Sequence, residues 1–339
     1  MRIAIDGMGG DNAPDEIVKG CVEASKLIDD IIYIVGLEDV IKKELKKYKF
    51  DKNKIKIVNA TEVILNEDSP VKAARTKKDS SMIKALSLVK DGICDVAISA
   101  GNTGALMAGA LFNLGRIKGI DRPAIGMTYP IIGQGVSFLV DAGANAECKP
   151  RNLLEFAHMG SIYMEKVLGI ENPTVGLVNI GAEEKKGTPV LKETYALLKE
   201  SNLNFIGNVE GRDIPFGASN VLVCDGFVGN TVLKLTEGLA MRIMDLLKEM
   251  FTTNVKSKMG ALMLSGQIKD LKKIMDYSEY GGAPILGVRG AVIKIHGSSK
   301  ANAVKSAIIK SIPYVQHDVV NVIKEAVEKQ EVPAEIEQI

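Results

Sequence analysis

The sequence predicts a doubly wound α/β fold, in which helices cover both faces of a mainly parallel sheet. Short apolar runs alternate with longer amphipathic segments along most of the chain, which is the strand and helix order of such folds. Four of the runs, at residues 93–99, 136–141, 174–179 and 220–224, are apolar almost throughout, as strands buried on both faces are. Gly- and Asn-rich segments directly follow several strands, where an open α/β sheet binds its ligands.

The first half of the chain alternates strand and helix. A strand is expected at residues 2–6, and the helix after it, at 14–28, opens on a proline in its first turn, where the missing N–H has no helical partner anyway. The next elements are a strand at 31–35, a lysine-rich surface helix at 37–47, a strand at 54–59, a helix at 80–90, the strand at 93–99 and a helix at 103–114.

The second half repeats this order before it becomes rich in turns. Helices at 150–168, 188–200 and 230–251 follow the three remaining apolar strands. The last elements are a helix at 258–276, a turn-rich stretch at 280–284, a strand at 291–295 and helices at 301–312 and 319–329. No repeat, low-complexity tract or linker marks a boundary, so we expect one domain over residues 1–339, with a protruding helical segment at about 231–276.

Composition narrows the class of protein. A chain of 339 residues that is 46% hydrophobic can bury a large core. Its 43 Lys and Arg residues balance 42 Asp and Glu residues, which argues against the strong positive field of a nucleic-acid-binding protein. The four cysteines form no CxxC pair, and we interpret them as reduced core thiols. The chain opens on a strand without a signal peptide and has no apolar run near ~18 residues, so a cytoplasmic protein is expected.

The Gly- and Asn-rich segments are expected to form one polar rim. The five segments lie at residues 6–11, 99–104, 141–145, 179–181 and 225–230. Because the carboxyl ends of parallel strands meet at one edge of a sheet, the segments should come together there and form a catalytic site.

The turn around residues 99–106 is the strongest local signal for a ligand. A strand ends at Ser99 and a helix begins near Thr103, which leaves backbone N–H groups at a helix N-terminus, where an oxyanion or a phosphate binds. The alternative is a tight turn in which Gly101 and Gly104 only relieve backbone strain. The segment 6–11 is weaker, because it lacks the GxGxxG spacing of a dinucleotide site and carries two aspartates.

Arg75 and Lys77 are candidate cations before the helix at 80–90. Asp79 and Ser80 are its N-cap candidates, so an ordinary capped and solvated helix start is the alternative interpretation.

Two later segments could also place polar groups at the site. The loop at 179–187 carries Lys185 and Lys186, although such a charged loop is usually plain surface. At residues 225–230 a strand again meets a helix, so Asn230 could cap the helix or point its amide at a ligand.

The chain is poor in catalytic bases and nucleophiles. It has three histidines, no HExxH or GxSxG motif and no cysteine in a nucleophile setting. Of the histidines, His296 at a strand end is the candidate for the site, whereas His158 and His317 are expected to be structural or exposed. Such a chain suits a nucleophile that is already ionised, as inorganic phosphate is with a second pKa near ~6.

Five longer motifs together resemble one enzyme family, the acyl-[acyl-carrier-protein]:phosphate acyltransferases of bacterial phospholipid synthesis (PlsX). The motifs are Ala4–Asp11, AIDGMGGD; Ser99–Leu106, SAGNTGAL; Asn208–Ile214, NVEGRDI; Cys224–Asn230, CDGFVGN; and Glu279–Pro284, EYGGAP. They occur in the family's order between residue 1 and about residue 330. Gly7, where many members have alanine, is a small departure from the family pattern.

The resemblance implies a reaction and an architecture. The protein would transfer a fatty acyl group from acyl carrier protein to inorganic phosphate, without a cofactor or a metal. It would be a homodimer and a peripheral membrane protein, with the three-layer α/β/α fold of the isocitrate and isopropylmalate dehydrogenases and of phosphotransacetylase. The rival interpretations are a phosphotransacetylase that uses acyl-CoA, a metal-dependent decarboxylating dehydrogenase, and a non-enzymatic scaffold for fatty-acid enzymes.

The resemblance also assigns the site. Its catalytic residues fall on Lys186 and Asn230, although the doubled lysine leaves open whether Lys185 or Lys186 reaches the substrate. Together with the turn analysis it gives these substrate-binding candidates: Ser99, Gly101, Asn102, Thr103, Gly104, Arg75, Lys77, Asp225 and His296.

The helix at 258–276 carries a candidate membrane contact. One face bears an apolar stripe that would pack on the protein body or on a partner subunit: Ala261, Leu264, Ile268, Leu271 and Met275. Leu262 and Met263 point away from this stripe at ~100° per residue, beside Lys256 and Lys258. An apolar tip with neighbouring lysines is the arrangement of a peripheral contact with anionic lipid.

Overall fold

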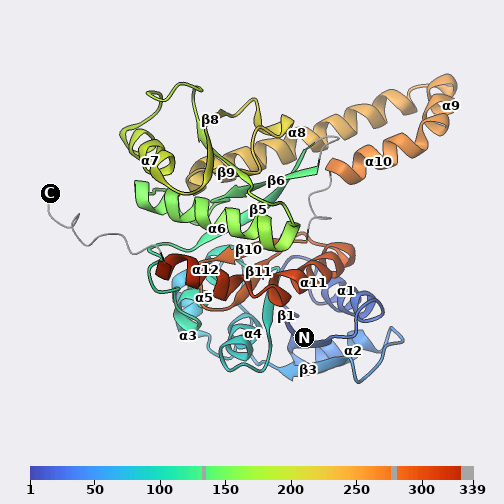
Figure 1. Ribbon diagram of the computed structural model, residues 1–339. Helices are drawn as coiled ribbons and strands as arrows, with labels where there is room; N and C mark the ends of the chain where they lie inside the picture. The colour runs from blue at the N-terminus through green and yellow to red at the C-terminus, as the bar shows by residue number, and fades with distance from the viewer. Residues whose placement is uncertain (132–134, 276–280, 330–339) are drawn as a thin grey trace.

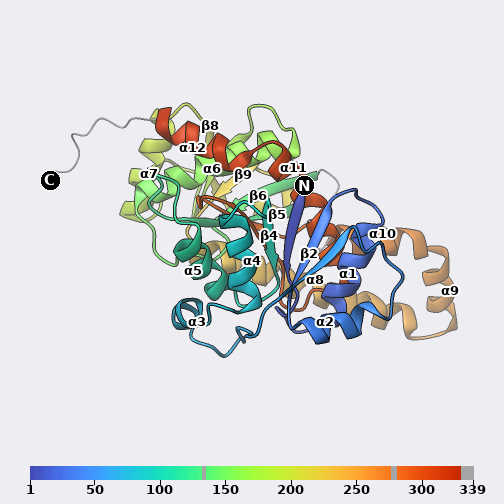
Figure 2. The ribbon, with the colours of Figure 1, turned by 90° about the horizontal axis from the view of Figure 1, so that it is seen from below.

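A single mixed sheet runs through the protein (Figures 1 and 2). The computed structural model describes residues 1–131, 135–275 and 281–329, apart from the side chains of residues 270 and 272–275. Within them the eleven strands lie in the order β3-β2-β1-β4-β11-β10-β5-β6-β9-β7-β8. Their bounds are β1 (Arg2–Asp6), β2 (Ile31–Gly36), β3 (Ile55–Asn59), β4 (Val96–Ser99), β5 (Ala124–Ile131), β6 (Gly135–Val140), β7 (Thr174–Asn179), β8 (Asn204–Glu210), β9 (Val221–Val223), β10 (Ala283–Leu286) and β11 (Ala291–Lys294).

Helices cover both faces of the sheet, so the expected three-layer α/β/α fold is confirmed. Helices α1, α2, α6, α7, α11 and α12 cover one face, α3, α4 and α5 cover half of the other, and the start of α8 covers the rest. The helix bounds are α1 (Asp15–Ser25), α2 (Glu38–Leu45), α3 (Pro70–Thr76), α4 (Ser81–Lys90), α5 (Thr103–Asn113), α6 (Pro150–Leu168), α7 (Pro189–Glu200), α8 (Gly226–Thr252), α9 (Val255–Met263), α10 (Ser265–Met275), α11 (Ala301–Gln316) and α12 (Val319–Lys329), with a 3₁₀ turn at Ile214–Phe216.

Successive side chains of each strand point to opposite faces of the sheet and so contribute to the core on both sides. Ile3 and Ile5 pack on the side of α1 and α11, whereas Ala4 between them faces α4. All three side chains are almost fully buried, as expected of a strand in the middle of a sheet covered on both sides.

The two halves of the sheet run in opposite directions, and the expectation that the five Gly- and Asn-rich segments all leave one edge of the sheet is therefore wrong. β11 is parallel to β4, β10 is antiparallel to β11 and to β5, and β5 is antiparallel to β6. β6, β7, β8 and β9 are parallel to one another. The segments after β1 and β4 thus leave one edge of the sheet, and those after β6, β7 and β9 leave the opposite edge. The reason is that the three central pairings, of β11 with β10, β10 with β5 and β5 with β6, are all antiparallel, so the strand direction is reversed across the centre.

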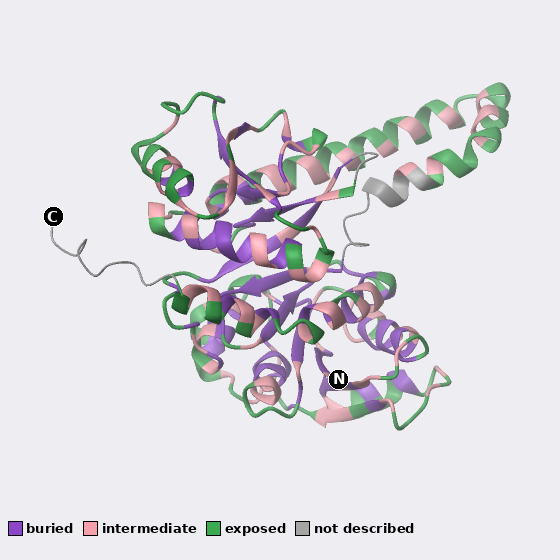
Figure 3. Ribbon diagram, viewed as in Figure 1, coloured by how far each residue is buried: buried purple, intermediate pink, exposed green. Residues whose placement is uncertain are grey.

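Helices α8, α9 and α10 form an arm that projects from the body (Figures 1 and 3). The helix expected at 258–276 is in fact broken at Leu264, which lies between α9 and α10. The apolar stripe expected on one continuous helix is consequently divided between two helices, and the side chain of Met275 lies outside the described residues. None of the described helices is long and apolar enough to cross a membrane.

Candidate active site

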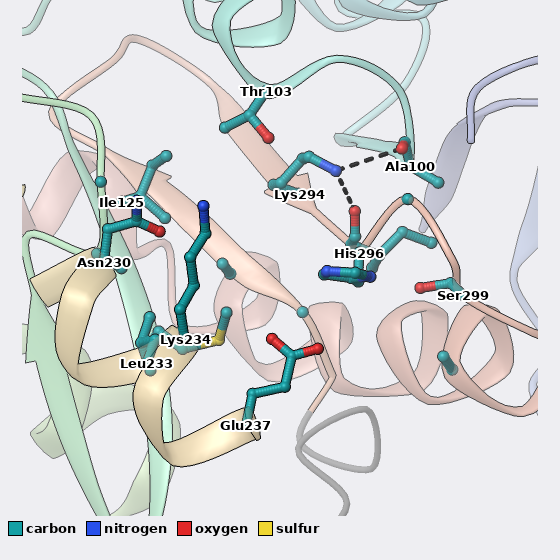
Figure 4. A pocket seen from close by; sticks show the side chains of 18 of the residues that line it. Ala100, Thr103, Ile125, Asn230, Leu233, Lys234, Glu237, Lys294, His296 and Ser299 are labelled. Atoms are coloured by element: carbon teal, nitrogen blue, oxygen red, sulfur yellow. Dashed lines mark hydrogen bonds between the residues drawn. The ribbon is translucent and has the colours of Figure 1, made fainter. Parts of the chain in front are cut away.

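A cavity of about 630 Å³ lies where the two halves of the sheet meet (Figure 4). Its wall consists of the turn between β4 and α5, the strand β5, the first turns of α8 and the end of β11. Although the strands of the two halves end at opposite edges of the sheet, four of the five predicted segments contribute to this cavity: Asp11 from 6–11, residues 100–104 from 99–104, Ala142 and Gly143 from 141–145, and Asn230 from 225–230. The cavity is large enough for a small-molecule ligand.

The turn after β4 supplies free backbone donors. Asn102 caps α5 by accepting a hydrogen bond from the Ala105 N–H at 2.9 Å. The N–H groups of Thr103 and Gly104, in the same first helical turn, have no acceptor within the described residues. Both residues line the cavity, as do Gly101 and Asn102. N–H groups without a protein acceptor at a helix N-terminus can bind an anion, so the geometry of this turn is compatible with the anion site expected there.

Ser99 lies beneath this turn and supports it. Its Oγ donates to Asp6 Oδ2 at 2.6 Å and accepts from the Gly101 N–H at 3.0 Å. Ser99 is 3% exposed and is not part of the cavity wall. In the structure it positions the turn, whereas the sequence analysis had assigned it to substrate binding.

Lys294, at the end of β11, brings a buried ammonium group to the cavity. Its Nζ donates to the carbonyl oxygens of Ala100, at 3.3 Å, and of Ile295 (Figure 4). Burial lowers its pKa to about 8, although the nearby carboxylates of Asp6 and Asp11 act in the opposite direction. Sequence reasoning missed this residue, and the signal that could have found it is a lysine inside the otherwise apolar strand AVIKI.

Helix α8 contributes a second polar group to the cavity. Asn230, near the start of the helix, and Lys234, one turn later on the same face, both line the cavity and project into it (Figure 4). Gly143 lies against Asn230, since a Cβ at Gly143 would lie 3.3 Å from the Asn230 Cβ. Lys234 and Glu237 were not singled out from the sequence, although their spacing of four and seven residues from Asn230 places them on its helical face.

The loop that supports Asn230 is organised by Asp141. This fully buried carboxylate accepts hydrogen bonds from the backbone N–H groups of Ile125, Gly143, Ala144 and Asn145, at 2.7–3.1 Å. A buried carboxylate with this many donors holds the loop rigidly.

His296 follows β11 and lies on the cavity wall, as expected. Its Nδ1 accepts from the Ser298 N–H at 3.2 Å and lies 2.7 Å from Ser298 Oγ. The ring is thereby held in one orientation beside Lys294.

The remaining cationic candidates lie outside the cavity wall. The Arg75 guanidinium stacks on the Phe112 ring at 4.6 Å, and Lys77 Nζ pairs with Asp68 at 2.5 Å. Lys186 Nζ lies 3.8 Å from Glu183, and neither it nor Lys185 lines the cavity in this chain.

Asp225 caps α8 and does not line the cavity. Its carboxylate accepts from the Val228 N–H at 2.8 Å, so in the structure it holds the start of the helix. In the described part of the chain, no group of three His, Cys, Asp or Glu side chains could hold a metal ion.

Known proteins resemble this chain over nearly its whole length. The model of a family described as "Fatty acid synthesis protein" matches residues 1–322. The "Phosphate acyltransferase" of Clostridioides difficile is 53% identical over 329 residues, which are 97% of each chain, and that of Alkaliphilus oremlandii is 56% identical over 327 residues, 96% of this chain and 97% of the relative.

Solved structures share the fold at low sequence identity. A phosphotransacetylase from Streptococcus pyogenes superimposes with a TM-score of 0.64 at 15% identity, covering 93% of this chain and 94% of the other. A 4-hydroxythreonine-4-phosphate dehydrogenase from Klebsiella pneumoniae gives a TM-score of 0.54 at 11% identity, covering 93% and 99%. At this identity the likeness concerns the fold alone.

Proposed function

The chain belongs to the phosphate acyltransferase family, and from that premise we propose that it transfers a fatty acyl group from acyl carrier protein to inorganic phosphate. One observation carries the proposal: a single cavity combines an anion-binding end with an apolar wall. The anion-binding end consists of the N–H groups of Thr103 and Gly104. The apolar wall includes Ile125, Met127 and Leu233. The two ends suit a phosphate and the beginning of an acyl chain.

The reaction needs little beyond positioning and charge stabilisation. A phosphate oxygen attacks the thioester carbonyl carbon, a C–O bond forms, the C–S bond breaks, and the thiol of the carrier leaves with a proton. A thioester is already activated, so holding phosphate in line and stabilising the tetrahedral oxyanion account for most of the catalysis. The side-chain amide of Asn230 projects into the cavity opposite the Thr103 turn and is our candidate oxyanion donor.

Lys186 is proposed as a further charge-stabilising group. It lies on the exposed loop after β7, and its contact with Glu183 is a loose, solvated ion pair. Such pairs contribute only about 0–1 kcal/mol, so a substrate docking over the loop can replace Glu183 as its partner.

The reaction is tested by incubating the purified protein with acyl carrier protein thioester and inorganic phosphate, without added metal or nucleotide. Trapping with hydroxylamine should report acyl phosphate that depends on phosphate. Acyl-CoA is assayed in parallel, since a clear preference for it would favour a phosphotransacetylase. If neither thioester were lost in a phosphate-dependent manner, the enzymatic function would be ruled out and the non-enzymatic scaffold would be favoured.

We also propose that the protein is a homodimer, formed through the arm. Within the chain, the 27-residue helix α8 buries only Gly226 and Gly229. Beyond its first two turns it exposes these large apolar side chains: Leu235, Leu239, Met241, Ile243, Leu246 and Met250. A monomer seldom leaves an apolar face of this size in water. Sedimentation velocity should show a dimer, and Leu239→Glu with Ile243→Glu should convert it to a monomer; a monomeric wild type would refute the proposal.

The tip of the arm is proposed to touch membrane, so that a cytoplasmic enzyme delivers its product at the lipid surface. Leu262 and Met263 are 76% and 83% exposed, and Lys256 and Lys258 nearby are exposed as well. Apolar side chains flanked by lysines favour an anionic lipid surface.

Leu262→Glu with Met263→Glu should reduce co-sedimentation with anionic liposomes while soluble activity and dimerisation stay near wild type. The matched control is Leu27→Glu with Phe216→Glu, which places the same charge at exposed apolar positions of the body. Unchanged liposome binding, or loss of the dimer, would mean that the tip is a contact between subunits.

A further inference from the structure

We propose that Lys294 is the phosphate-binding cation of the cavity, acting together with the free N–H groups of Thr103 and Gly104. The inference rests on the proposed function, because it names the group that receives one of its two substrates. The cations that the sequence offered for the site, Arg75, Lys77, Lys185 and Lys186, all lie outside the cavity wall.

The fold places the Lys294 side chain beside the anion-binding turn. β11 runs parallel to β4 in a register that pairs Lys294 with Ser99, so the two strands end side by side. Ala100 and the turn that contains Thr103 follow directly. The buried ammonium and the helix N-terminus therefore face the same part of the cavity.

The hydrogen bonds of Lys294 leave one donor for a ligand. An ammonium group carries three N–H donors and no acceptor. Two donate to the carbonyl oxygens of Ala100 and Ile295, and the described residues offer no acceptor to the third. The two carbonyls also hold Nζ in place, so little side-chain freedom is lost when a ligand binds.

The charge of Lys294 lacks a direct counter-ion. The side chain is only 9% exposed, and burial of an unpaired ammonium is costly. Asp6 and Asp11 raise its pKa from a distance, but among the described residues no carboxylate lies within 4.0 Å of Nζ. A phosphate dianion in the cavity would supply the missing partner, and the free N–H groups beside it would bind the same anion.

The other charged groups of the cavity do not fill this role. Lys234 projects from α8 but is exposed, so its charge is already solvated. Asp11 and Glu237 also line the wall. Because their carboxylates repel phosphate, the anion should bind where a cation is closest, at the ammonium group of Lys294.

Steady-state kinetics with varied phosphate test the assignment. Lys294→Met should raise the KM for phosphate by at least ~10-fold, as expected for loss of a hydrogen bond to a charged group, and change the KM for the thioester by less than ~3-fold. Lys234→Met is the matched comparison, a lysine of the same cavity with an exposed ammonium. A larger rise in the phosphate KM for Lys234→Met, or no rise for Lys294→Met, would overturn the proposal.

The pH dependence of the reaction gives a second readout of the role of Lys294. kcat/KM for phosphate should fall as the pH rises through about 8, where Lys294 loses its proton in the free enzyme. Lys294→Arg should move this fall to higher pH, because guanidinium stays charged. A profile that is flat to pH 9.5, or one that Lys294→Arg leaves in place, would contradict the role of Lys294.

Direct binding separates this inference from the proposed reaction. Titration of inorganic phosphate, followed by ³¹P NMR, should show binding to the wild type and at least ~10-fold weaker binding to Lys294→Met. A wild type that binds phosphate through Lys294 yet forms no acyl phosphate would refute the reaction and keep the site. Equal phosphate binding by both proteins would refute the site, whatever the activity.

Discussion

Gly229→Ala should disable the enzyme by moving α8, although Gly229 itself contributes no chemical group. A Cβ at this position would lie 1.9 Å from the backbone oxygen of Asp141, and real Cβ atoms essentially never approach another heavy atom within 3.0 Å. The helix or the loop must therefore move by about 1.1 Å. The loop cannot easily yield, because the Asp141 carboxylate is held by the N–H groups of Ile125 and Asn145. The start of α8, with Asn230 next to the new methyl group, has to move away from the cavity wall.

The expected loss follows from this displacement. A misplacement of ~1 Å in a catalytic group costs on the order of 10²-fold in rate, and forcing a methyl group into a packed site costs about 1–3 kcal/mol of stability. We therefore expect kcat/KM to fall by about 10²-fold while the protein still folds. The assay is acyl phosphate formation, with circular dichroism and urea unfolding as the test of folding.

Gly238→Ala is the matched control in the same helix. A Cβ there meets no atom within 4 Å, so replacing a glycine inside a helix should stabilise the protein by about 0.5–1 kcal/mol and leave activity near wild type. If Gly229→Ala kept more than a third of the wild-type activity, or if its loss matched the fraction unfolded, the argument that α8 positions Asn230 would be wrong.

Three further predictions address single side chains. Lys186→Ala and Asn230→Ala should fold normally and lose ~10²-fold or more in kcat/KM, as removal of an oxyanion donor does, whereas Lys185→Ala should cost much less; a sensitive Lys185 with a tolerant Lys186 would reverse the assignment of the loop. Ser99→Ala removes the hydroxyl that joins Asp6 to the Gly101 N–H and should lower the free energy of unfolding by about 3 kcal/mol in urea, and a change below about 1 kcal/mol would contradict a supporting role. Burial lowers the pKa of His158 to about 4 from 6.5, so the unfolded chain takes up a proton first, and stability should decrease by about 3 kcal/mol as the pH falls from 6.5 to 4. His158→Gln should abolish this decrease in the free energy of unfolding. If that free energy depended on pH in the same way in both proteins, the prediction would be refuted.

Much of the fold could be predicted because its central strands and their helices have strong periodicity. Every strand and helix expected from the sequence occurs within a few residues of its predicted position, apart from the break at Leu264. The elements that were missed are short or irregular. β5 and β10 contain Pro130 and Pro284, which are unfavourable inside strands. The edge strand β8, NFIGNVE, has a glycine in its middle and no regular alternation of apolar and polar residues.

The direction of the strands could not be predicted from the sequence, although it determines which segments meet at the cavity. Periodicity shows which residues are buried but carries no information on which way a strand runs, so the reversal at β10 and β5 could not be inferred. The turn with Thr103 and Gly104 could be selected from the sequence because capping and glycine spacing are local, and the structure places it on the cavity wall. The position of Lys294 in the cavity depends on the pairing of β11 with β4, and local sequence patterns do not reveal such a long-range contact.

The position of β10 and β11 has a consequence for how the protein is made. During translation, residues 1–131 and most of the second half of the chain leave the ribosome before the segment 283–294 is synthesised. In the folded protein, however, that segment lies between β4 and β5 at the centre of the sheet. Until it emerges, each half presents an open strand edge, and such edges invite wrong pairing. Because β11 also ends in Lys294, the cavity is completed only when the sheet is. A nascent chain interrupted before residue 283 thus carries neither a closed sheet nor a complete cavity.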